Sequence, residues 1–252
     1  MNYSKIIDLV KQTKQFIISD ELKNEISMKG EADFVTAADI AISNHLKEKL
    51  WEIDPSIGFF SEEENGALSE KCWILDPIDG TTNLVYGYNM SSVSLALYDK
   101  GRIVFGVVYN PFNDECFTAE LGKGAFLNKK PLCTAKREMS KSIIEFGACS
   151  TRKDDADKSF ALGKMIFKEC LDIRRICSSA LAICFIAAGR IDGYFESHLK
   201  PWDYAAGCLI LSEAGGISSA YDGTPLPYDV PSTIIASNGI IHERLKKIIN
   251  TH

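Results

Sequence analysis

The chain has 252 residues, enough for one large domain or for two closely joined halves around a substantial core. Its hydrophobic content of 46% and charged content of 25% are typical of a globular protein in water, and its net charge of −6 argues against nucleic-acid binding as its main task. No apolar run approaches the roughly 20 residues that span a bilayer. The first residues contain no secretory apolar region, and the eight cysteines are scattered without a CxxC pair. We therefore expect a cytoplasmic protein with reduced thiols and no membrane segment.

Hydrophobic periodicity and turn signals predict alternating helices and strands. In chain order, the expected helices span residues 2–18, about 36–50, 158–169, 178–188, 203–214 and 239–249. The expected strands span 57–60, 73–75, 91–99, 102–110, 114–120, 143–148, 192–195 and 232–236, with a hairpin turn at 99–101. The first part of the sequence is rich in predicted hairpins, and the later part alternates between strands and helices. This order predicts a layered α/β (α+β) protein.

The most informative segment is WILDPIDGTTN, residues 73–83. Its apolar start is typical of the end of a buried strand, and Pro77 is expected to take the chain out of the sheet because it lacks a backbone donor. Asp76 and Asp79 then converge beyond the strand end. Two adjacent carboxylates repel each other unless a cation lies between them, and hard oxygen ligands favour Mg²⁺, Mn²⁺ or Ca²⁺ over zinc.

The same segment continues into a predicted anion-binding turn. Gly80 permits a tight turn and a close approach to a ligand, and the amides around Gly80 and Thr81 can face an anion at a helix start. Metal-binding acids followed by such a turn indicate a phosphate site. The alternative is that Asp-Pro-x-Asp-Gly only forms a turn, because these residues are the ones that turns prefer.

Three further acids stand at the ends of predicted elements. Asp39 lies three residues after Thr36 and is explained either as a functional acid or as part of a helix capping box. Glu62 follows an apolar strand and is either a ligand or part of a solvated glutamate run. Asp203 follows Pro201 and Trp202 and is either a ligand or a helix N-cap.

WILDPIDGTTN and PWDYAAGCLILSEAGG (201–216), in this order, resemble the inositol monophosphatase family, a group of Mg²⁺-dependent, lithium-sensitive sugar phosphatases. The resemblance runs from Lys29 to the final helix. It implies a five-layer αβαβα sandwich, with residues 1–252 as a single catalytic domain of two packed halves, about 1–140 and 141–252. It also implies a homodimer.

The resemblance assigns a role to each candidate residue. Two to three Mg²⁺ ions, for which Mn²⁺ is a possible substitute, would be bound by the side chains of Glu62, Asp76, Asp79 and Asp203 and the carbonyl of Ile78. Thr81, oriented by Asp39, would act with Glu62 on the attacking water, and Gly80 and Thr81 would bind the phosphate. The hydroxyls of the substrate would face Asp79, Ser179 and Glu196. Lys29 resembles a family lysine that organises a further water.

Two departures affect the expected substrate. Cys177 stands where the family usually has glycine, and Ser179 where it usually has alanine. We expect a Mg²⁺-dependent phosphatase for inositol monophosphate or a similar small polyol phosphate. The alternatives are a fructose-1,6-bisphosphatase or broad sugar phosphatase and, from another class, a non-catalytic binding protein of the same fold.

Overall fold

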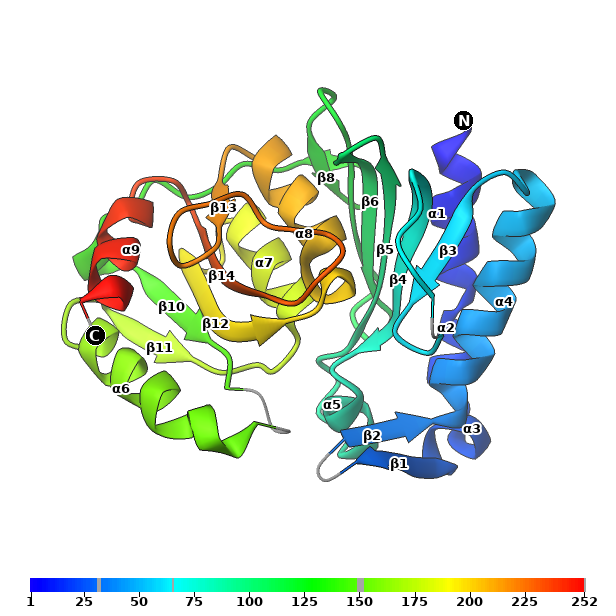
Figure 1. Ribbon diagram of the computed structural model, residues 1–252, viewed down its shortest axis with the longest axis horizontal. Helices are drawn as coiled ribbons and strands as arrows, with labels where there is room; N and C mark the ends of the chain where they lie inside the picture. The colour runs from blue at the N-terminus through cyan, green and yellow to red at the C-terminus, as the bar shows by residue number, and fades with distance from the viewer. Residues whose placement is uncertain (31–32, 65, 149–151, 252) are drawn as a thin grey trace.

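The computed structural model describes residues 1–30, 33–64, 66–148 and 152–251, without the side chains of residues 29, 30 and 33. Its secondary structure is stacked in five layers, in the order helix, sheet, helix, sheet, helix (Figure 1). The predicted αβαβα sandwich is therefore confirmed. The N-terminus lies at the end of the first helical layer, and the C-terminus follows the last helix, α9 (His242–Asn250), at the opposite end of the stack.

The first sheet has seven strands in the order β3-β4-β5-β6-β7-β8-β9. Their bounds are β3 (Gly58–Ser61), β4 (Lys71–Asp79), β5 (Ser92–Asp99), β6 (Arg102–Asn110), β7 (Glu115–Glu120), β8 (Ala125–Leu127) and β9 (Lys130–Pro131). β3 and β4 are parallel, and each later strand runs antiparallel to its neighbour. The predicted hairpin is confirmed, because Asp99 pairs with Arg102 across Lys100 and Gly101, which both have positive φ.

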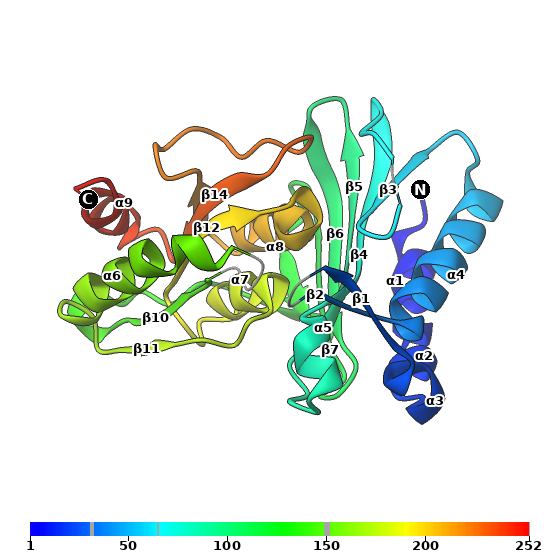
Figure 2. The ribbon, with the colours of Figure 1, turned by 60° about the horizontal axis from the view of Figure 1, so that its bottom comes forward.

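The second sheet has the order β11-β10-β12-β14-β13. Its strands are β10 (Ile143–Phe146), β11 (Asp172–Arg174), β12 (Gly193–Leu199), β13 (Ile217–Ser219) and β14 (Ser232–Ser237). β10 runs parallel to both β11 and β12, whereas β14 runs antiparallel to its two neighbours. A separate two-stranded sheet, β1 (Ile26–Gly30) with β2 (Asp33–Thr36), was not predicted and lies beside α5 (Thr81–Val85), as Figures 1 and 2 show.

Three apolar clusters hold the layers together. The first joins α1 (Tyr3–Gln12), α2 (Lys14–Ile17) and α4 (Ala37–Ile53) to the first sheet. The second lies around α7 (Ser179–Ala187) and α8 (Pro201–Glu213), between the two sheets. The third lies between the second sheet and α6 (Ala156–Phe167) with α9. Since α7 and α8 are covered on both sides, nearly every side chain of α7 is buried, and no amphipathic pattern is needed.

The remaining short elements are α3 (Asp20–Asn24) and the 3₁₀ turns Met139–Lys141 and Lys153–Asp155. The helix expected at 2–18 is interrupted at Thr13, whose hydroxyl donates a hydrogen bond to the Val10 carbonyl at 2.6 Å. No helix in the described part of the chain is long and apolar enough to cross a membrane. Seven of the cysteines are free thiols; Cys149 lies outside the described residues.

Candidate functional site

β4 delivers two aspartates to one face of the sheet by means of a bulge. The prediction that the chain leaves the sheet at Pro77 is wrong, because pairing with β5 resumes at Asp79. Asp76 pairs with Ser94 and Asp79 with Ser92, so an advance of three residues along β4 lies opposite an advance of only two along β5. In a regular strand, residues three apart point to opposite faces, whereas one extra residue restores the same face. The missing donor of Pro77 is accommodated in that bulge.

Asp203 reaches this face from the start of α8. Pro201 is the first helical residue, a position where its lack of an N–H costs nothing, and Asp203 is the third. Its Oδ2 accepts a hydrogen bond from the Lys200 amide at 2.7 Å, so it caps the helix from inside and is not the N-cap itself. The preceding Trp202 fixes the helix start on the first sheet: its ring lies edge-on to Phe60, with 5.2 Å between ring centroids.

The strand-end acids, defined as Glu62, Asp76, Asp79 and Asp203, lie close enough to perturb one another. Burial and then the charges of Glu62, Asp79 and Asp203 raise the pKa of Asp76 well above its ordinary value. Burial and then the charges of Asp79 and Glu62 do the same for the pKa of Asp203. Carboxylates that mutually raise their pKa values lower the free energy of a cation placed among them.

Asp79 is held at the N-terminus of α7 as well. Its Oδ1 accepts from the Ser179 amide at 3.1 Å, and its Oδ2 accepts from the Ala180 amide at 3.0 Å and from the Ser178 hydroxyl. The Ser92 hydroxyl is a weaker donor, at 3.4 Å. Burial raises the pKa of Asp79 to about 6 even though these hydrogen bonds lower it. Asp79 therefore connects the end of the first sheet to the helical layer between the sheets.

The turn after β4 brings Asp39 and Thr81 together. Gly80 has φ +88°, and an added Cβ there would lie 3.0 Å from the Met90 carbonyl, so glycine is required. The Thr81 hydroxyl lies 2.9 Å from the Ile78 carbonyl and 3.3 Å from Asp39 Oδ1. Asp39 Oδ2 also accepts from the backbone and hydroxyl of Thr36. The capping and functional interpretations of Asp39 are thus both compatible with its position.

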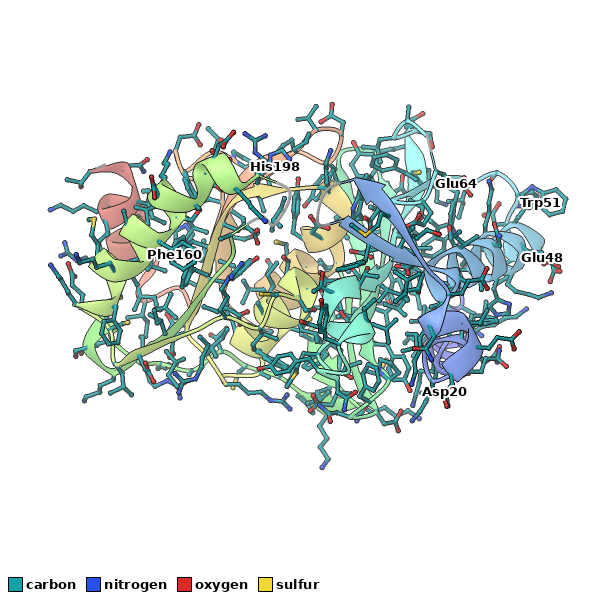
Figure 3. The ribbon with its side chains drawn as sticks, turned by 90° about the horizontal axis from the view of Figure 1, so that it is seen from below. Asp20, Glu48, Trp51, Glu64, Phe160 and His198 are labelled. Atoms are coloured by element: carbon teal, nitrogen blue, oxygen red, sulfur yellow. The ribbon has the colours of Figure 1, made fainter. Side chains whose placement is uncertain are left out.

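The glutamate run 62–64 divides between the site and the surface. The amide of Glu62 donates to the Leu75 carbonyl at 3.2 Å, which places the residue beside β4. Glu64 forms an ion pair with Lys47 of α4 at 2.8 Å (Figure 3). Glu62 therefore lies next to Asp76, whereas Glu64 lies on the surface beside α4. Lys29, the remaining candidate near this end, has its side chain outside the described residues.

Glu196, on β12, forms the other side of the site with Ser179 and Tyr194; these three residues are called the α7–β12 wall. Tyr194 was not predicted from the sequence. Its hydroxyl donates to Glu196 Oε2, and its oxygen lies 2.9 Å from Ser179 Oγ. Burial raises the pKa of Glu196 to about 7. Glu196 is 7% exposed, so most of its side chain is buried.

Glu145, on β10, is a second buried acid that the sequence analysis missed. It is 1% exposed; Oε1 accepts from the Ile176 amide at 2.8 Å, and Oε2 has no hydrogen-bond partner among the described residues. Burial raises its pKa to about 7. The turn that it supports ends in Cys177, which has φ +63°, a conformation that favours glycine. A lone acid within the apolar run Ile143–Phe146 was the signal that could have revealed it.

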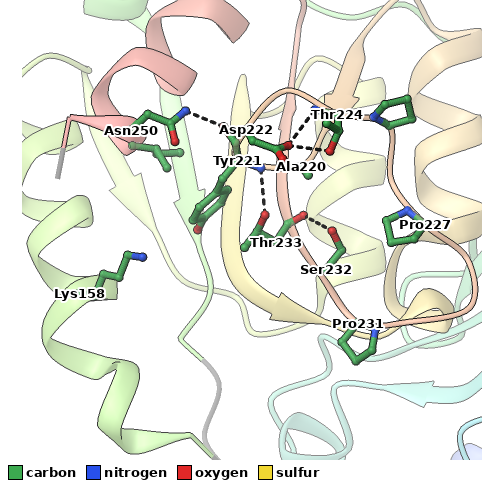
Figure 4. Close-up of a pocket in the computed structure, with 12 residues that line it drawn as sticks. Lys158, Ala220, Tyr221, Asp222, Thr224, Pro227, Pro231, Ser232, Thr233 and Asn250 are labelled. Atoms are coloured by element: carbon green, nitrogen blue, oxygen red, sulfur yellow. Dashed lines mark hydrogen bonds between the residues drawn. The ribbon is translucent and has the colours of Figure 1, made fainter.

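Other hollows of the molecule lie away from these acids. A cavity of about 730 Å³ lies between Lys158 of α6 and the loop before β14 (Figure 4). Its lining is formed mainly by prolines, Thr224, Tyr221 and Asn250 and includes none of the strand-end acids. We therefore base the site on the convergent carboxylates.

The donor chemistry of the strand-end acids fits Mg²⁺. In the described ranges, no group of three or more His, Cys, Asp or Glu side chains has the geometry to hold a metal ion by itself. Mg²⁺ does not require such a cage, because it keeps several waters and typically uses one or two carboxylates together with phosphate oxygens. Pairs of strand-end acids, with the Ile78 carbonyl, meet that requirement, and the site contains no thiolate or imidazole donor that would favour zinc.

Comparisons with known proteins identify the family of this chain. A model of the inositol monophosphatase family matches residues 3–252. The chain is 38% identical over 234 residues to an inositol-1-monophosphatase of Rhizobium meliloti (strain 1021), covering 91% of this chain and 88% of the relative. It is 38% identical over 229 residues to the Nus factor SuhB of Pasteurella multocida (strain Pm70), covering 89% and 85%.

A solved structure shares the fold over nearly its full length. The crystal structure of an IMPase/NADP phosphatase complexed with Mg²⁺ and phosphate superimposes with a TM-score of 0.88 and 25% sequence identity. The alignment covers 99% of this chain and 95% of the other. The similarity therefore includes both sheets and all the elements that carry the site.

Proposed function

Because the chain belongs to the inositol monophosphatase family, we propose that it is a Mg²⁺-dependent phosphomonoesterase for inositol monophosphate or a similar small polyol phosphate. The observation that carries this proposal is the convergence of the strand-end acids beside the Gly80 turn. Four carboxylates, from the residue after β3, from β4 and from the start of α8, lie so close that the charges of Glu62 and Asp79 raise the pKa values of both Asp76 and Asp203, an arrangement stabilised by divalent cations. The Mg²⁺ and phosphate of the similar solved structure support the same chemistry.

Each residue has a role that its surroundings support. Glu62, Asp76, Asp79 and Asp203, with the Ile78 carbonyl, would hold two to three Mg²⁺ ions, or Mn²⁺ in their place. Bound there, the ions supply a water of lowered pKa and offset the charge of the phosphate. Thr81, whose hydroxyl is positioned by Asp39 and Ile78, orients the attacking water together with Glu62. The amides around Gly80 and Thr81 bind the phosphate oxygens.

The α7–β12 wall faces the alcohol part of the substrate. Glu196 is a hydrogen-bond acceptor for hydroxyl groups, which a polyol offers, and Asp79 and Ser179 complete the contact. The hydroxyl of Ser179 in this wall, and the side chain of the nearby Cys177 where the family usually has glycine, differ from the usual family pattern. That difference supports a broader sugar phosphatase, including fructose-1,6-bisphosphatase activity, as the second candidate.

Phosphate release with and without Mg²⁺, and then with Li⁺, tests the proposal. The substrates are inositol 1-phosphate, fructose 1,6-bisphosphate and glycerol 2-phosphate. We expect Mg²⁺-dependent release, inhibition by Li⁺ and a preference for inositol 1-phosphate. A preference for another of these phosphates keeps the reaction and changes the substrate.

The same assay decides between an enzyme and a binding protein. A relative named Nus factor SuhB gives reason to test a non-catalytic role of this fold. No release from any substrate, in a folded protein that binds Mg²⁺, would support that role. We also propose a cytoplasmic homodimer; sedimentation of the purified protein at twice the monomer mass of 27.9 kDa is the check.

A further inference from the structure

The two carboxylate oxygens of Glu196 have different surroundings. Oε2 accepts a hydrogen bond from the Tyr194 hydroxyl and lies 3.5 Å from Ser179 Oγ. Oε1 accepts no hydrogen bond from the described residues, and it is not among the buried polar atoms that lack a partner. The small exposed fraction of Glu196, 7%, therefore includes Oε1. One oxygen is engaged inside the protein, and the other is open to a ligand.

The hydroxyls that engage Oε2 form a directed chain. A tyrosine hydroxyl has one proton, and that of Tyr194 is donated to Glu196. Ser179 is consequently the donor in its 2.9 Å contact with the Tyr194 oxygen. Successive hydrogen bonds of this kind polarise one another, so the serine strengthens the bond from Tyr194 to Glu196.

Ser179 also connects this series of hydrogen bonds to the strand-end acids. Its amide donates to Asp79 Oδ1 at 3.1 Å, while its side chain begins the path to Glu196. A single residue at the first position of α7 therefore sets the position of Glu196 relative to Asp79. The backbone contact does not depend on the side chain, so the two functions can be separated by substitution.

Gly147 closes the opposite side of the carboxylate. An added Cβ at Gly147 would lie 1.9 Å from Glu196 Oε2 and 2.1 Å from its Cδ, so the carboxylate lies directly against the glycine backbone. The Gly147 amide donates to the Phe195 carbonyl at 3.0 Å, which fixes that backbone to β12. The carboxylate of Glu196 is thus held in place by Gly147, with both of its oxygens near the glycine.

We propose that Ser179 is a specificity-determining residue: with Tyr194 it keeps Glu196 Oε2 engaged, so that Glu196 accepts only one hydroxyl of a polyol phosphate, through Oε1. This inference rests on the proposed function and deepens it. The preferred substrates present a single hydroxyl to Glu196, and adjacent hydroxyls on the same ring contribute nothing there. Oε2 has a second acceptor lone pair beside the one that Tyr194 uses, and Ser179 Oγ, 3.5 Å away, occupies the space next to it. Loss of the serine hydroxyl opens that space for a second hydroxyl of the substrate.

Kinetics on inositol 1-phosphate and each of its monodeoxy analogues test this inference. A position bound by Glu196 is one whose deletion lowers kcat/KM in the parent protein but has no further effect in Glu196→Ala, which has no side-chain acceptor. We expect one such position in the wild-type protein, with a loss of about 10- to 100-fold, as for a hydrogen bond to a charged group. In Ser179→Ala we expect two such hydroxyl positions, and deletion of the second hydroxyl should lower kcat/KM by a factor in the same range.

Two control variants separate this effect from general damage to the wall. Ser179→Thr retains the hydroxyl and should keep a single position. Ser197→Ala removes a neighbouring buried hydroxyl that has no hydrogen-bond partner among the described residues, and it should also keep one position. Two positions in the wild type, or an unchanged single position in Ser179→Ala, would overturn the inference.

Calorimetric binding of the same analogues, with Mg²⁺ present, distinguishes this inference from the proposed function. If no phosphate is released but the analogues bind, the proposed function fails. The inference is then decided by the number of hydroxyl positions whose deletion weakens binding, one in the wild type and two in Ser179→Ala. If phosphate is released and the count does not change in Ser179→Ala, only the inference fails. Absence of both release and binding overturns both.

Discussion

The strand-end acids and the glutamates of the second sheet, Glu145 and Glu196, are stabilised in different ways. Asp76 and Asp203 have neighbouring carboxylates among the chief causes of their raised pKa values. Burial is the largest cause of the raised pKa values of all four acids, but for Glu145 and Glu196 the next largest influence is a hydrogen-bond donor that lowers the pKa, the Ile176 amide and the Tyr194 hydroxyl respectively. The first group therefore requires an external positive charge, whereas the second can retain a proton near neutral pH.

The largest expected effect follows from removing one charge from the first group. Asp203→Asn should lower kcat at least about 100-fold, because the stabilisation of the phosphate by a correctly held cation is worth several kcal/mol. The asparagine oxygen can still accept from the Lys200 amide, and repulsion with Asp76 and Asp79 is relieved. The metal-free variant should therefore be more stable than the wild type, by about 1 kcal/mol. Phosphate release and urea unfolding measure the two effects.

Asp79→Asn provides the contrasting case. Both carboxylate oxygens of Asp79 accept hydrogen bonds, so one amide N–H of an asparagine must face a donor at the start of α7. We expect a similar loss of activity, but here with a loss of stability of about 1–3 kcal/mol. Urea unfolding of both variants, side by side, is the measurement. Equal stabilities would show that the helix start does not hold Asp79 as described.

The second group should make the metal-free protein less stable as pH rises. Folded Glu145 and Glu196 have pKa values of about 7, above the unfolded value of 4.5. Between these values the folded state holds more protons than the unfolded state, so stability is highest below about pH 4.5 and is lost up to about pH 7. The expected loss is about 3 kcal/mol for each of the two residues, measured by urea unfolding in EDTA.

The variant Glu145→Gln measures how much of this pH dependence of stability comes from Glu145. Glutamine can still accept from the Ile176 amide and carries no proton to lose, so the decrease between pH 4.5 and 7 should be smaller than in the wild type. A slope identical to that of the wild type would mean that Glu145 does not hold its proton in the folded state.

The smallest expected effect concerns His242, which is remote from both groups of acids. Its ring nitrogens lie 3.1 Å from the Ser219 and Ser237 hydroxyls, and burial lowers its pKa below 6.5. The unfolded state therefore binds the proton first, and stability is lost as pH falls from about 6.5 toward the folded pKa. Against His242→Asn, the wild type should lose about 1 kcal/mol more in this range. A difference independent of pH would contradict a buried neutral imidazole.

The first group was predictable from the sequence because its signals are local. A strand followed by Asp-Pro-Ile-Asp-Gly, and an acid after Pro201 and Trp202, identify the candidates without knowledge of their neighbours. The bulge was not predictable, because it depends on which residue of β5 faces Asp79. Pro77 taken alone indicates the end of a strand.

The second group depends on contacts between distant segments. Ser178 lies 99 residues from its partner Asp79, and Glu145 lies 31 residues from the Ile176 amide that it binds. Ser179 and Glu196 were identified only through the family resemblance. Tyr194 lies in a predicted strand, and its sequence context gave no sign of a functional role. Local patterns therefore sufficed for the longer helices α4, α6, α7, α8 and α9, for the hairpin and for proposing the strand-end acids, but not for the short helices or for the hydrogen bonds of the α7–β12 wall.

Calorimetric titration of Mg²⁺, in the presence of inorganic phosphate, tests the central claim most directly. The wild type and Asp76→Asn are compared at pH 7.5, because Asp76 is the most deeply buried of the strand-end acids, at 2% exposed. We predict saturable Mg²⁺ binding in the wild type that is weakened at least about 10-fold, or lost, in the variant. Equal Mg²⁺ affinities for the two proteins would contradict the assignment of the strand-end acids as the metal site.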